Sequence, residues 1–391
     1  MAVDFPSSPT PGQVYTQAGA TWTWDGVKWV AQGTGTGIYL PLAGGTMTGD
    51  ITLKGDPSAP LHPVTYRMVS NPNDNRIING DMRIDQRNNG ASGTAAGYLI
   101  DRWQYFSTQV SKFTWGRNLN SVVGPTGFPY YLGFQSSSAY ASVASDQFII
   151  PQAVEADAVS DFAWGTANAQ PVTLSFWARS SLTGTFGGVI NNYASTRGYP
   201  FTFSIPTANT WTRIVVTIPG DTAGTWVMNG NAGSLYVVFD LGSGTTYRAP
   251  AGAWISGAYS GATGAVSVVA TNGATFYVTG VKLEVGSVAT PYNRQSLAKS
   301  MADCQRCYQT SGNVCLEGYS SGASATVGST IWFQAQMRAM PTLVHSGESY
   351  SNGSGLAFDQ ITQNVCRALW TGNGAGRSAI SGLSFNLSAE L

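Results

Sequence analysis

Charged side chains are scarce in this 391-residue sequence, and their scarcity excludes one class of partner. Lys and Arg together number 20, as do Asp and Glu, so charged residues make up 10% of the chain and the formal net charge is zero. A typical soluble domain carries about a quarter charged residues. Nucleic-acid binding rests largely on neutralisation of phosphates by an excess of basic residues. We therefore expect no nucleic-acid partner.

Cysteine is also scarce, and its distribution argues against disulfide and metal chemistry. The four cysteines, at positions 304, 307, 315 and 366, all lie in the last quarter of the chain. They are too few for a disulfide framework, and we expect reduced thiols. Cys304 and Cys307 have Cys-x-x-Cys spacing, but a structural zinc site needs two more ligands at matching spacing, and a redox motif needs a βαβ context. We expect no metal and no cofactor.

Long apolar runs are absent as well. No stretch approaches the roughly 20 continuous apolar residues that cross a bilayer. Residues 1–18 lack the basic start and apolar stretch of a secretory signal. We expect a chain made in the cytoplasm without membrane insertion.

The residues of hydrolytic catalysis occur only in weak patterns. Histidine is present only as His62 and His345. Residues 318–322 match the Gly-x-Ser-x-Gly letters, but small polar residues follow where a nucleophile elbow needs a helix. Ser296 and Lys299 have Ser-x-x-Lys spacing, but neither Ser-Asp-Asn nor Lys-Thr-Gly accompanies them. We interpret the first pattern as a loop and the second as the capped start of a helix.

Paired carboxylates, which glycoside hydrolysis requires, are equally hard to find. Glutamate occurs only at positions 155, 284, 317, 348 and 390, and the acidic cluster Glu155, Asp157 and Asp161 is typical of a solvated loop or a calcium site. The repeat of a β-helix is not visible either. We expect no enzyme, and a polysaccharide depolymerase is the enzymatic alternative.

Glycine and aromatic residues are abundant, and the first of them form a hairpin pattern. The chain has 47 glycines and 12% aromatic residues, which suits a rigid β-protein with many turns. Residues 21–24 and 27–30 flank Asp25-Gly26, a signal for a two-residue turn that pairs Trp24 with Val27 and Trp22 with Trp29. A hairpin alone is marginal. We expect residues 1–32 to attach the chain to another subunit or protein through Trp22, Trp24 and Trp29, or to pack on its own next domain.

Residues 33–74 combine a linker and a short repeat. Residues 33–37 alternate Gly and Thr, the run 40–53 is punctuated by glycine, and residues 60–69 could form a short helix. The run 40–53, with Gly55-Asp56-Pro57 after it, resembles the stalk repeat of tailed-bacteriophage fibre proteins. Phe5-Pro6, Pro9, Gly12, Tyr15 and the tryptophan cluster are similar to N-terminal modules of the same proteins. The resemblance implies a trimeric fibre with a short stalk.

Residues 75–295 contain one strand signal after another. Alternation in residues 172–179, 211–218 and 235–240, and a closing strand at 274–284, predict antiparallel sheets with one buried face. Residues 98–103 read as a further strand, and 229–230 and 272–273 as turns. Residues 76–84 and 98–103 resemble the entrance to β-sandwich domains of phage tail proteins. The pattern from Leu174 to Tyr292 looks like the jelly roll of carbohydrate-binding modules.

Residues 296–391 are predicted to form a connecting helix and a small β-domain. Leu297, Met301, Cys304 and Tyr308 share one helical face, and Ser296 can cap the helix. Residues 331–338 are predicted to form a strand and residues 340–342 a turn, and the two resemble the C-terminal domains of phage fibres.

Aromatic side chains are the candidates for ligand binding. Sugars bind to flat aromatic faces because one face of the sugar ring is apolar. The loop aromatics that could form such a surface, each with a core or subunit-interface role as the alternative, are Tyr130, Tyr131, Trp164, Tyr193, Tyr199, Trp226 and Trp254.

These observations predict an all-β chain, with an N-terminal hairpin, a short stalk, an antiparallel jelly-roll sandwich, one helix and a C-terminal β-domain. The expected function is that of a structural virion component, a short homotrimeric tail fibre that attaches to other virion proteins through its N-terminus and binds host-surface polysaccharide. The alternative is a head fibre or capsid decoration protein without a receptor role.

Overall fold

The computed structural model describes residues 4–17, 20–32 and 74–391, which belong to two compact units divided between Thr65 and Tyr66. The linker at 33–37, the predicted stalk repeat at 40–53, the helical run at 60–69 and His62 lie outside the described residues. Within the described residues, no helix is long and apolar enough to span a bilayer. The chain is mostly β-structure, as predicted.

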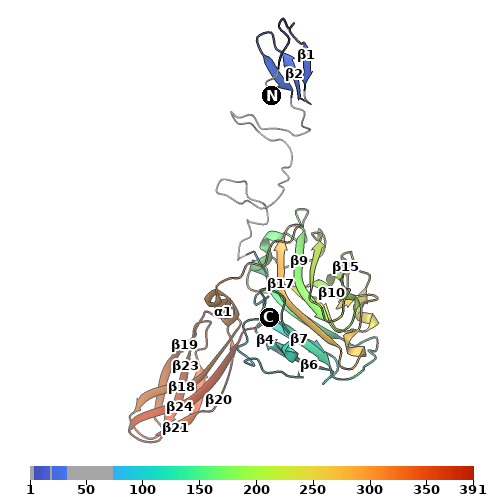
Figure 1. Cartoon of the computed structure of the whole chain (residues 1–391). Coiled ribbons are helices and arrows are strands. Elements are labelled where there is room, and N and C mark those ends of the chain that lie inside the picture. The colour runs from blue at the N-terminus through green and yellow to red at the C-terminus, as the bar shows by residue number, and fades with distance from the viewer. Residues whose placement is uncertain (1–3, 18–19, 33–73) are drawn as a thin grey trace. The chain divides into compact units, whose positions relative to one another are not determined.

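The N-terminal unit is a three-stranded antiparallel sheet of β1 (Val14–Gln17), β2 (Ala20–Trp24) and β3 (Trp29–Gln32), in that order (Figure 1). Strands β2 and β3 form the predicted hairpin, but the predicted register is wrong. Trp24 pairs with Trp29, not with Val27. The Asp25 carboxylate accepts hydrogen bonds from the backbone N–H groups of Val27 and Lys28, both at 2.8 Å, and this turn lengthens the loop to four residues.

The aromatic rings of this unit pack on one another. Phe5 stacks on Trp29 with ring centroids 5.3 Å apart and meets Trp22 edge to face at 5.4 Å. Tyr15 contacts the same three rings. Trp22, Trp24 and Trp29 are half-buried within their own unit. Their role in attachment to another protein stays a prediction.

Two antiparallel sheets form the sandwich (Figure 1). The seven-stranded sheet contains, in spatial order, β15 (Ile255–Ser256), β11 (Arg197–Ile205), β10 (Gly184–Asn192), β13 (Gly233–Asp240), β8 (Phe148–Glu155), β5 (Trp103–Ser107) and β4 (Gly97–Ile100). The five-stranded sheet contains β12 (Thr212–Ile218), β9 (Val172–Ser180), β17 (Thr275–Val285), β7 (Leu132–Ser136) and β6 (Phe113–Arg117). A parallel pair, β14 (Arg248–Ala249) and β16 (Gly261–Ala262), lies outside both sheets.

Period-two alternation directs one face of each sheet into a shared core. Along β13, Leu235, Val237 and Phe239 are buried in that core, whereas Tyr236 faces outward. Phe176 of the opposite sheet meets Phe239 edge to face at 4.9 Å. Burial of each such side chain stabilises the fold by about 1.5–3 kcal/mol. The predicted antiparallel sandwich is confirmed.

Two predicted strands differ from the structure. Residues 98–103 were expected to form one strand, but β4 and β5 are separate and antiparallel, joined by Asp101 and Arg102. Arg102 has φ 71°, a left-handed conformation that ends the extended backbone. The predicted strand at 331–338 stops early, because β19 (Thr326–Trp332) ends at Trp332.

The predicted helix is present as α1 (Leu297–Gln305), and the Ser296 hydroxyl accepts a hydrogen bond from the Lys299 backbone N–H at 3.3 Å. Its buried face is narrower than predicted. Cys304 is buried, but Leu297 is 59% exposed, and Tyr308 begins a strand. The first turn therefore projects into solvent.

The C-terminal region is a second, smaller pair of sheets. One contains β18 (Tyr308–Ser320), β24 (Gly376–Ser388), β20 (Thr342–Ser346) and β21 (Ser349–Ser351), and the other β19, β23 (Val365–Gly372) and β22 (Gly353–Asp359). Between them Trp370, Cys366, Ile380 and Leu383 form a separate core.

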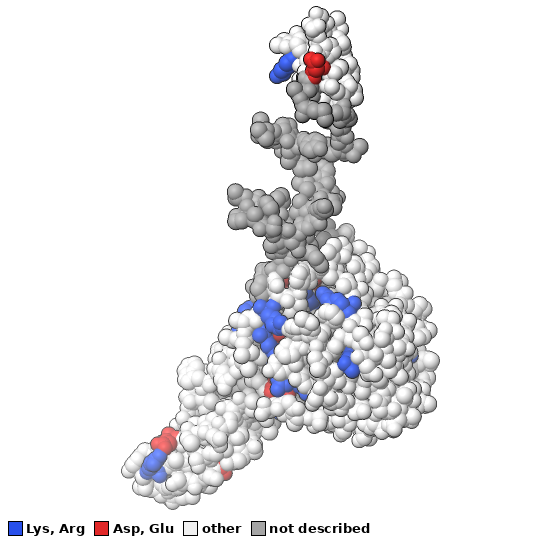
Figure 2. Space-filling model, viewed as in Figure 1, with Lys and Arg blue, Asp and Glu red and all other residues white. Residues whose placement is uncertain are grey.

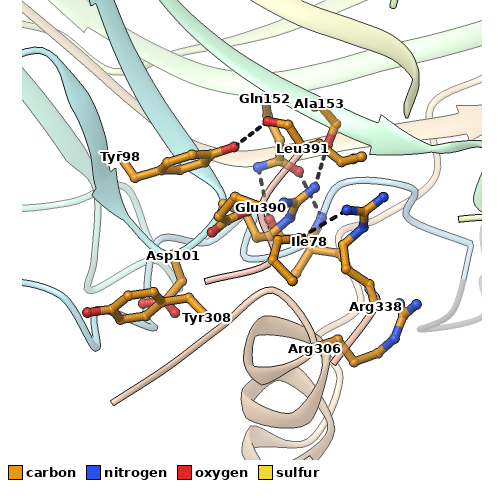
Figure 3. Close-up of polar contacts among 12 residues, drawn as sticks. Ile78, Tyr98, Asp101, Gln152, Ala153, Arg306, Tyr308, Arg338, Glu390 and Leu391 are labelled. Atoms are coloured by element: carbon orange, nitrogen blue, oxygen red, sulfur yellow. Dashed lines mark hydrogen bonds and ion pairs between the residues drawn. The ribbon is translucent and has the colours of Figure 1, made fainter. Parts of the chain in front are cut away.

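A buried ionic contact joins this region to the sandwich (Figure 3). Glu390, which follows β24, pairs with Arg87 at 2.7 Å and with the buried Arg102. The Tyr98 hydroxyl donates to the Leu391 carbonyl at 2.7 Å, as Figure 3 shows. Loss of one partner of this buried ion pair would leave an uncompensated charge between the two regions, which belong to one compact unit.

Candidate functional site

The outer face of the seven-stranded sheet carries a groove of about 280 Å³, which we name the sheet groove. Its lining residues come from four adjacent strands, β5, β8, β10 and β13, and from the segments before β8, after β10 and before β16. Its lining residues are Gln104, Phe106, Gln147, Ile149, Pro151, Asn191, Ser195, Tyr236, Val238, Ala258, Tyr259 and Ser260. None of these described residues is charged.

Strand alternation produces the floor of the groove. Ile149 and Pro151 on β8 face outward and alternate with the core residues Phe148 and Ile150. Phe106 of β5 pairs directly with Ile149 and is 46% exposed. An exposed aromatic ring beside an apolar floor provides the flat surface on which a sugar ring can stack.

Amides and hydroxyls border this floor. Gln147 Nε2 donates to Ser260 Oγ at 2.8 Å, and Asn191 Nδ2 donates to the Tyr259 carbonyl at 2.7 Å. These bonds orient both amides. The buried Asn191 Oδ1 has no hydrogen-bond partner among the described residues. The groove thus combines an apolar floor with directional polar groups, the usual composition of a small-molecule site.

Tyr236 is the central aromatic residue of the groove. It pairs across the strands with Asn191 and stacks on Tyr193, with ring centroids 4.9 Å apart and planes 15° from parallel. Burial, with a smaller contribution from the hydrogen bond to Tyr193, raises the pKa of the Tyr236 hydroxyl well above its usual value. Tyr236 therefore presents a neutral phenol at physiological pH.

Four of the seven predicted sugar-binding aromatics meet elsewhere. Trp164 contacts Trp226 at 4.7 Å and Trp254 at 5.0 Å, and Trp254 contacts Tyr199 at 5.3 Å. Trp164 and Tyr199 are buried, and the other two are half-buried against the core. Their packing with one another leaves little ring surface for a ligand.

Asp221 fixes this tryptophan cluster in place. It accepts a bond from Trp226 Nε1 at 3.0 Å and is paired with Arg197. Burial by itself would raise the pKa of Asp221, but the hydrogen bonds from Arg197 and Trp226 outweigh burial and lower it. The cluster has the contacts of a structural element.

The remaining predicted aromatics are divided. Tyr131 is buried between Trp211 and Tyr277, whereas Tyr130 is 37% exposed with the Arg117 guanidinium 5.0 Å from its ring centroid. Tyr193 stacks on Tyr236, a residue that lines the sheet groove. Sequence reasoning missed Phe106 and Tyr236. Tyr236 has an outward position in the predicted strand 235–240, which by itself does not distinguish a groove residue, and Phe106 lies beyond the strand predicted at 98–103.

The weak catalytic patterns have structural roles in the described residues. Glu155 pairs with Arg306 at 3.0 Å, Asp157 accepts a bond from the Gly230 N–H at 2.5 Å, and Asp161 pairs with Arg76, so the acidic cluster is divided among separate partners. The described residues contain no grouping of three or more potential metal ligands. Burial raises the pKa of the Cys307 thiol to about 12, which makes it unreactive at neutral pH.

The two serine patterns are likewise accounted for. Ser320 is buried at the end of β18 and donates to the Gly322 carbonyl at 2.8 Å. Lys299 forms an ion pair with Asp303 at 2.9 Å, one turn further along α1. Both side chains have local structural partners.

Comparison with known proteins gives distant structural likenesses. No protein-family model and no curated protein sequence matches the chain. A candidate sugar-binding protein from Bacteroides thetaiotaomicron has a TM-score of 0.32 and 12% identity, over 54% of this chain and 100% of that one. The enzymatically active domain of bacteriophage CBA120 tailspike protein 4 has a TM-score of 0.27 and 13% identity, over 55% of this chain and 22% of that one.

A carbohydrate-binding module, TmCBM61 in complex with β-1,4-galactotriose, has a TM-score of 0.28 and 10% identity, over 54% of this chain and 99% of that one. All three TM-scores are below 0.5, so no residue role is transferred from these proteins to this chain.

Proposed function

We propose that this chain is a non-catalytic fibre protein of a tailed-phage virion that binds host-surface glycan in the sheet groove. The observation that carries the binding proposal is the uncharged groove itself, with Phe106 and Tyr236 beside oriented amides. A neutral sugar ring needs an aromatic face and directional hydrogen bonds, and the groove offers both. The virion assignment is supported by the resemblance of residues 40–53 and of the tryptophan hairpin to phage fibre sequences.

The binding proposal is tested with the purified full chain on a panel of bacterial surface polysaccharides, with release of reducing ends measured in the same wells. Saturable binding without cleavage is the expected result. Tyr236→Ala should weaken that binding about tenfold, equivalent to about 1.4 kcal/mol. Tyr319→Ala, which removes a 75% exposed ring on the C-terminal sheet, is the matched control. Equal binding by both variants, or cleavage of the polysaccharide, would contradict the proposal.

The assembly proposal is a homotrimer attached to the phage tail through the N-terminal unit. Light scattering should give three times the 41.2 kDa chain mass, and a monomeric mass at micromolar concentration would contradict it. Immunogold labelling of virions should place the protein on the tail. Label on the capsid faces would instead support a head fibre or decoration protein.

A further inference from the structure

The outer face of the five-stranded sheet contains a second cavity, of about 440 Å³, on the opposite sheet from the groove. Among its lining residues are Phe128, Trp177, Arg213, Gly280, Tyr292 and Arg294. We name it the arginine cavity, because the described residues that line it include two arginines and no carboxylate.

A bulge in β17 shapes this cavity. The register of β17 against β9 shifts between Thr279 and Lys282, and Gly280 there has φ 61°. The Val281 N–H donates to the Gly80 carbonyl at 2.9 Å instead of to a neighbouring strand. A Cβ on Gly280 would lie 2.7 Å from Phe128 Cε1 and 3.2 Å from Trp177 Cδ1. Glycine therefore allows both rings to approach the backbone.

Arg213 is the arginine of the cavity that forms no ion pair with a described residue, whereas Arg294 is paired with Asp81. It lies on β12 directly across from Trp177 on β9. The only hydrogen bond from its side chain to a described residue is a 3.3 Å bond from Nη1 to the Ile214 carbonyl. The nearby Glu284 is already paired with Lys282 at 2.9 Å. Burial lowers the pKa of the Arg213 guanidinium, and the nearby Glu284 carboxylate offsets only part of that effect.

Arg294 adds a second guanidinium held in a fixed position. It donates from Nε to Asp81 at 2.9 Å and lies over the Phe128 ring, 4.6 Å from the centroid. Phe128 in turn meets Tyr292 edge to face at 5.3 Å. Arg294 Nη2 also donates to the Gly127 carbonyl, and the Arg294 side chain is 36% exposed.

We propose that the arginine cavity binds a carboxylated sugar unit, such as a uronate, with the carboxylate on Arg213 and the ring against Trp177. A guanidinium matches a carboxylate in planar, two-bond geometry. The adjacent indole supplies the flat apolar face that a sugar ring requires. This inference does not depend on ligand binding in the sheet groove.

Calorimetry with three probes separates the contributions of charge and ring. The probes are methyl glucuronide, methyl glucoside, which has the same ring without the carboxylate, and inorganic phosphate, which is an anion without a ring. The full chain should bind methyl glucuronide at least fivefold more tightly than either of the other two. Equal binding of glucuronide and glucoside would overturn the proposal, as would phosphate binding equal to glucuronide.

Two variants assign the binding to this cavity. Arg213→Gln should remove the preference for glucuronide over glucoside, and Arg213→Lys should retain part of it. Arg377→Gln, on the exposed C-terminal sheet, is the matched control and should leave the preference unchanged. A preference that survives in folded Arg213→Gln would overturn the proposal. Tyr236→Ala changes only the sheet groove. If this variant loses polysaccharide binding but still binds methyl glucuronide, the two sites are distinct.

Discussion

The outer faces of the two sandwich sheets differ in charge although the sheets share one core. The seven-stranded sheet carries an uncharged groove with Tyr236 at its centre, and the five-stranded sheet carries a cavity with Arg213 and Arg294. Charged residues are sparse over the whole chain, and Figure 2 shows a largely uncharged surface with basic groups on the sandwich. Because charges are scarce, an arginine without an ion pair, such as Arg213, indicates the charge of the ligand that its cavity can bind.

Glycine-to-alanine substitutions near the two sites should give the largest difference in the free energy of unfolding. Gly280→Ala beside the arginine cavity combines left-handed strain with a contact to Phe128 at 2.7 Å, and we expect a loss of about 2–4 kcal/mol in the free energy of unfolding. Gly264→Ala, in the segment that follows the sheet groove, has φ 80° and open space, so we expect only about 1–2 kcal/mol. Urea unfolding measures both, and equal losses would show that crowding at Gly280 is unimportant.

Alkaline pH should lower the stability of the fold through one half-buried tyrosine on each sheet face, Tyr236 and Tyr292. Burial is the largest cause that raises the pKa of Tyr236 beside the groove and of Tyr292 beside the cavity above the usual value near 10. The unfolded chain releases these protons near pH 10, while the folded chain retains them, so the free energy of unfolding falls as the pH rises above 10.

Urea unfolding at about pH 9 and pH 11 tests this linkage. Tyr236→Phe and Tyr292→Phe should each reduce the alkaline loss, and Tyr319→Phe, at an exposed position, should not. If neither Tyr236→Phe nor Tyr292→Phe changes how the free energy of unfolding depends on pH, the proposed linkage is wrong.

Salt should distinguish the two sites by their ligands. Raising the ionic strength from about 0.01 M to about 0.15 M shortens the Debye length from about 30 Å to about 8 Å. Methyl glucuronide binding at Arg213 should weaken about threefold or more, whereas neutral polysaccharide binding in the sheet groove should change by less than about twofold. Calorimetry at both salt concentrations checks this. If salt weakens binding at the two sites equally, the proposed difference in charge between them is wrong.

A charge introduced into the neutral groove should produce the smallest effect. Gln104→Arg places a guanidinium at the edge of the sheet groove, where solvent screens it. We expect an anionic polysaccharide to bind up to about fivefold more tightly, since exposed ion pairs contribute about 0.2–1 kcal/mol. Binding titrations with Gln104→Asn as control measure the change, and no gain would mean that Gln104 does not approach the ligand.

The local sequence pattern predicted the strands in which buried and exposed residues alternate clearly, and it predicted the helix. The antiparallel strands β9, β12, β13 and β17 and the helix capped by Ser296 followed from periodicity and capping chemistry. The turn at Asp101–Arg102 was missed because a buried, left-handed arginine gives no local signal and is stabilised by Glu390, 288 residues away. The predicted register of the N-terminal hairpin was wrong because the hydrogen bonds to the Asp25 carboxylate stabilise a loop of four residues instead of two.

The sites could be predicted less well than the fold. The aromatic content indicated that stacking surfaces exist, but Trp164, Trp226 and Trp254 pack edge to face against one another. Tyr236, which lines the groove, occupies an ordinary outward position on its strand. Arg213 becomes notable only because Glu284 has paired with Lys282 instead.

The sequence by itself determined the all-β class, the two-faced strands and the near absence of charge, because these depend on composition and on the two-residue period of a strand. Tertiary structure alone decided which aromatic rings stay exposed and which arginine lacks a carboxylate. Those properties depend on strand order, on the β17 bulge and on contacts between residues far apart in the chain, and no local pattern records them.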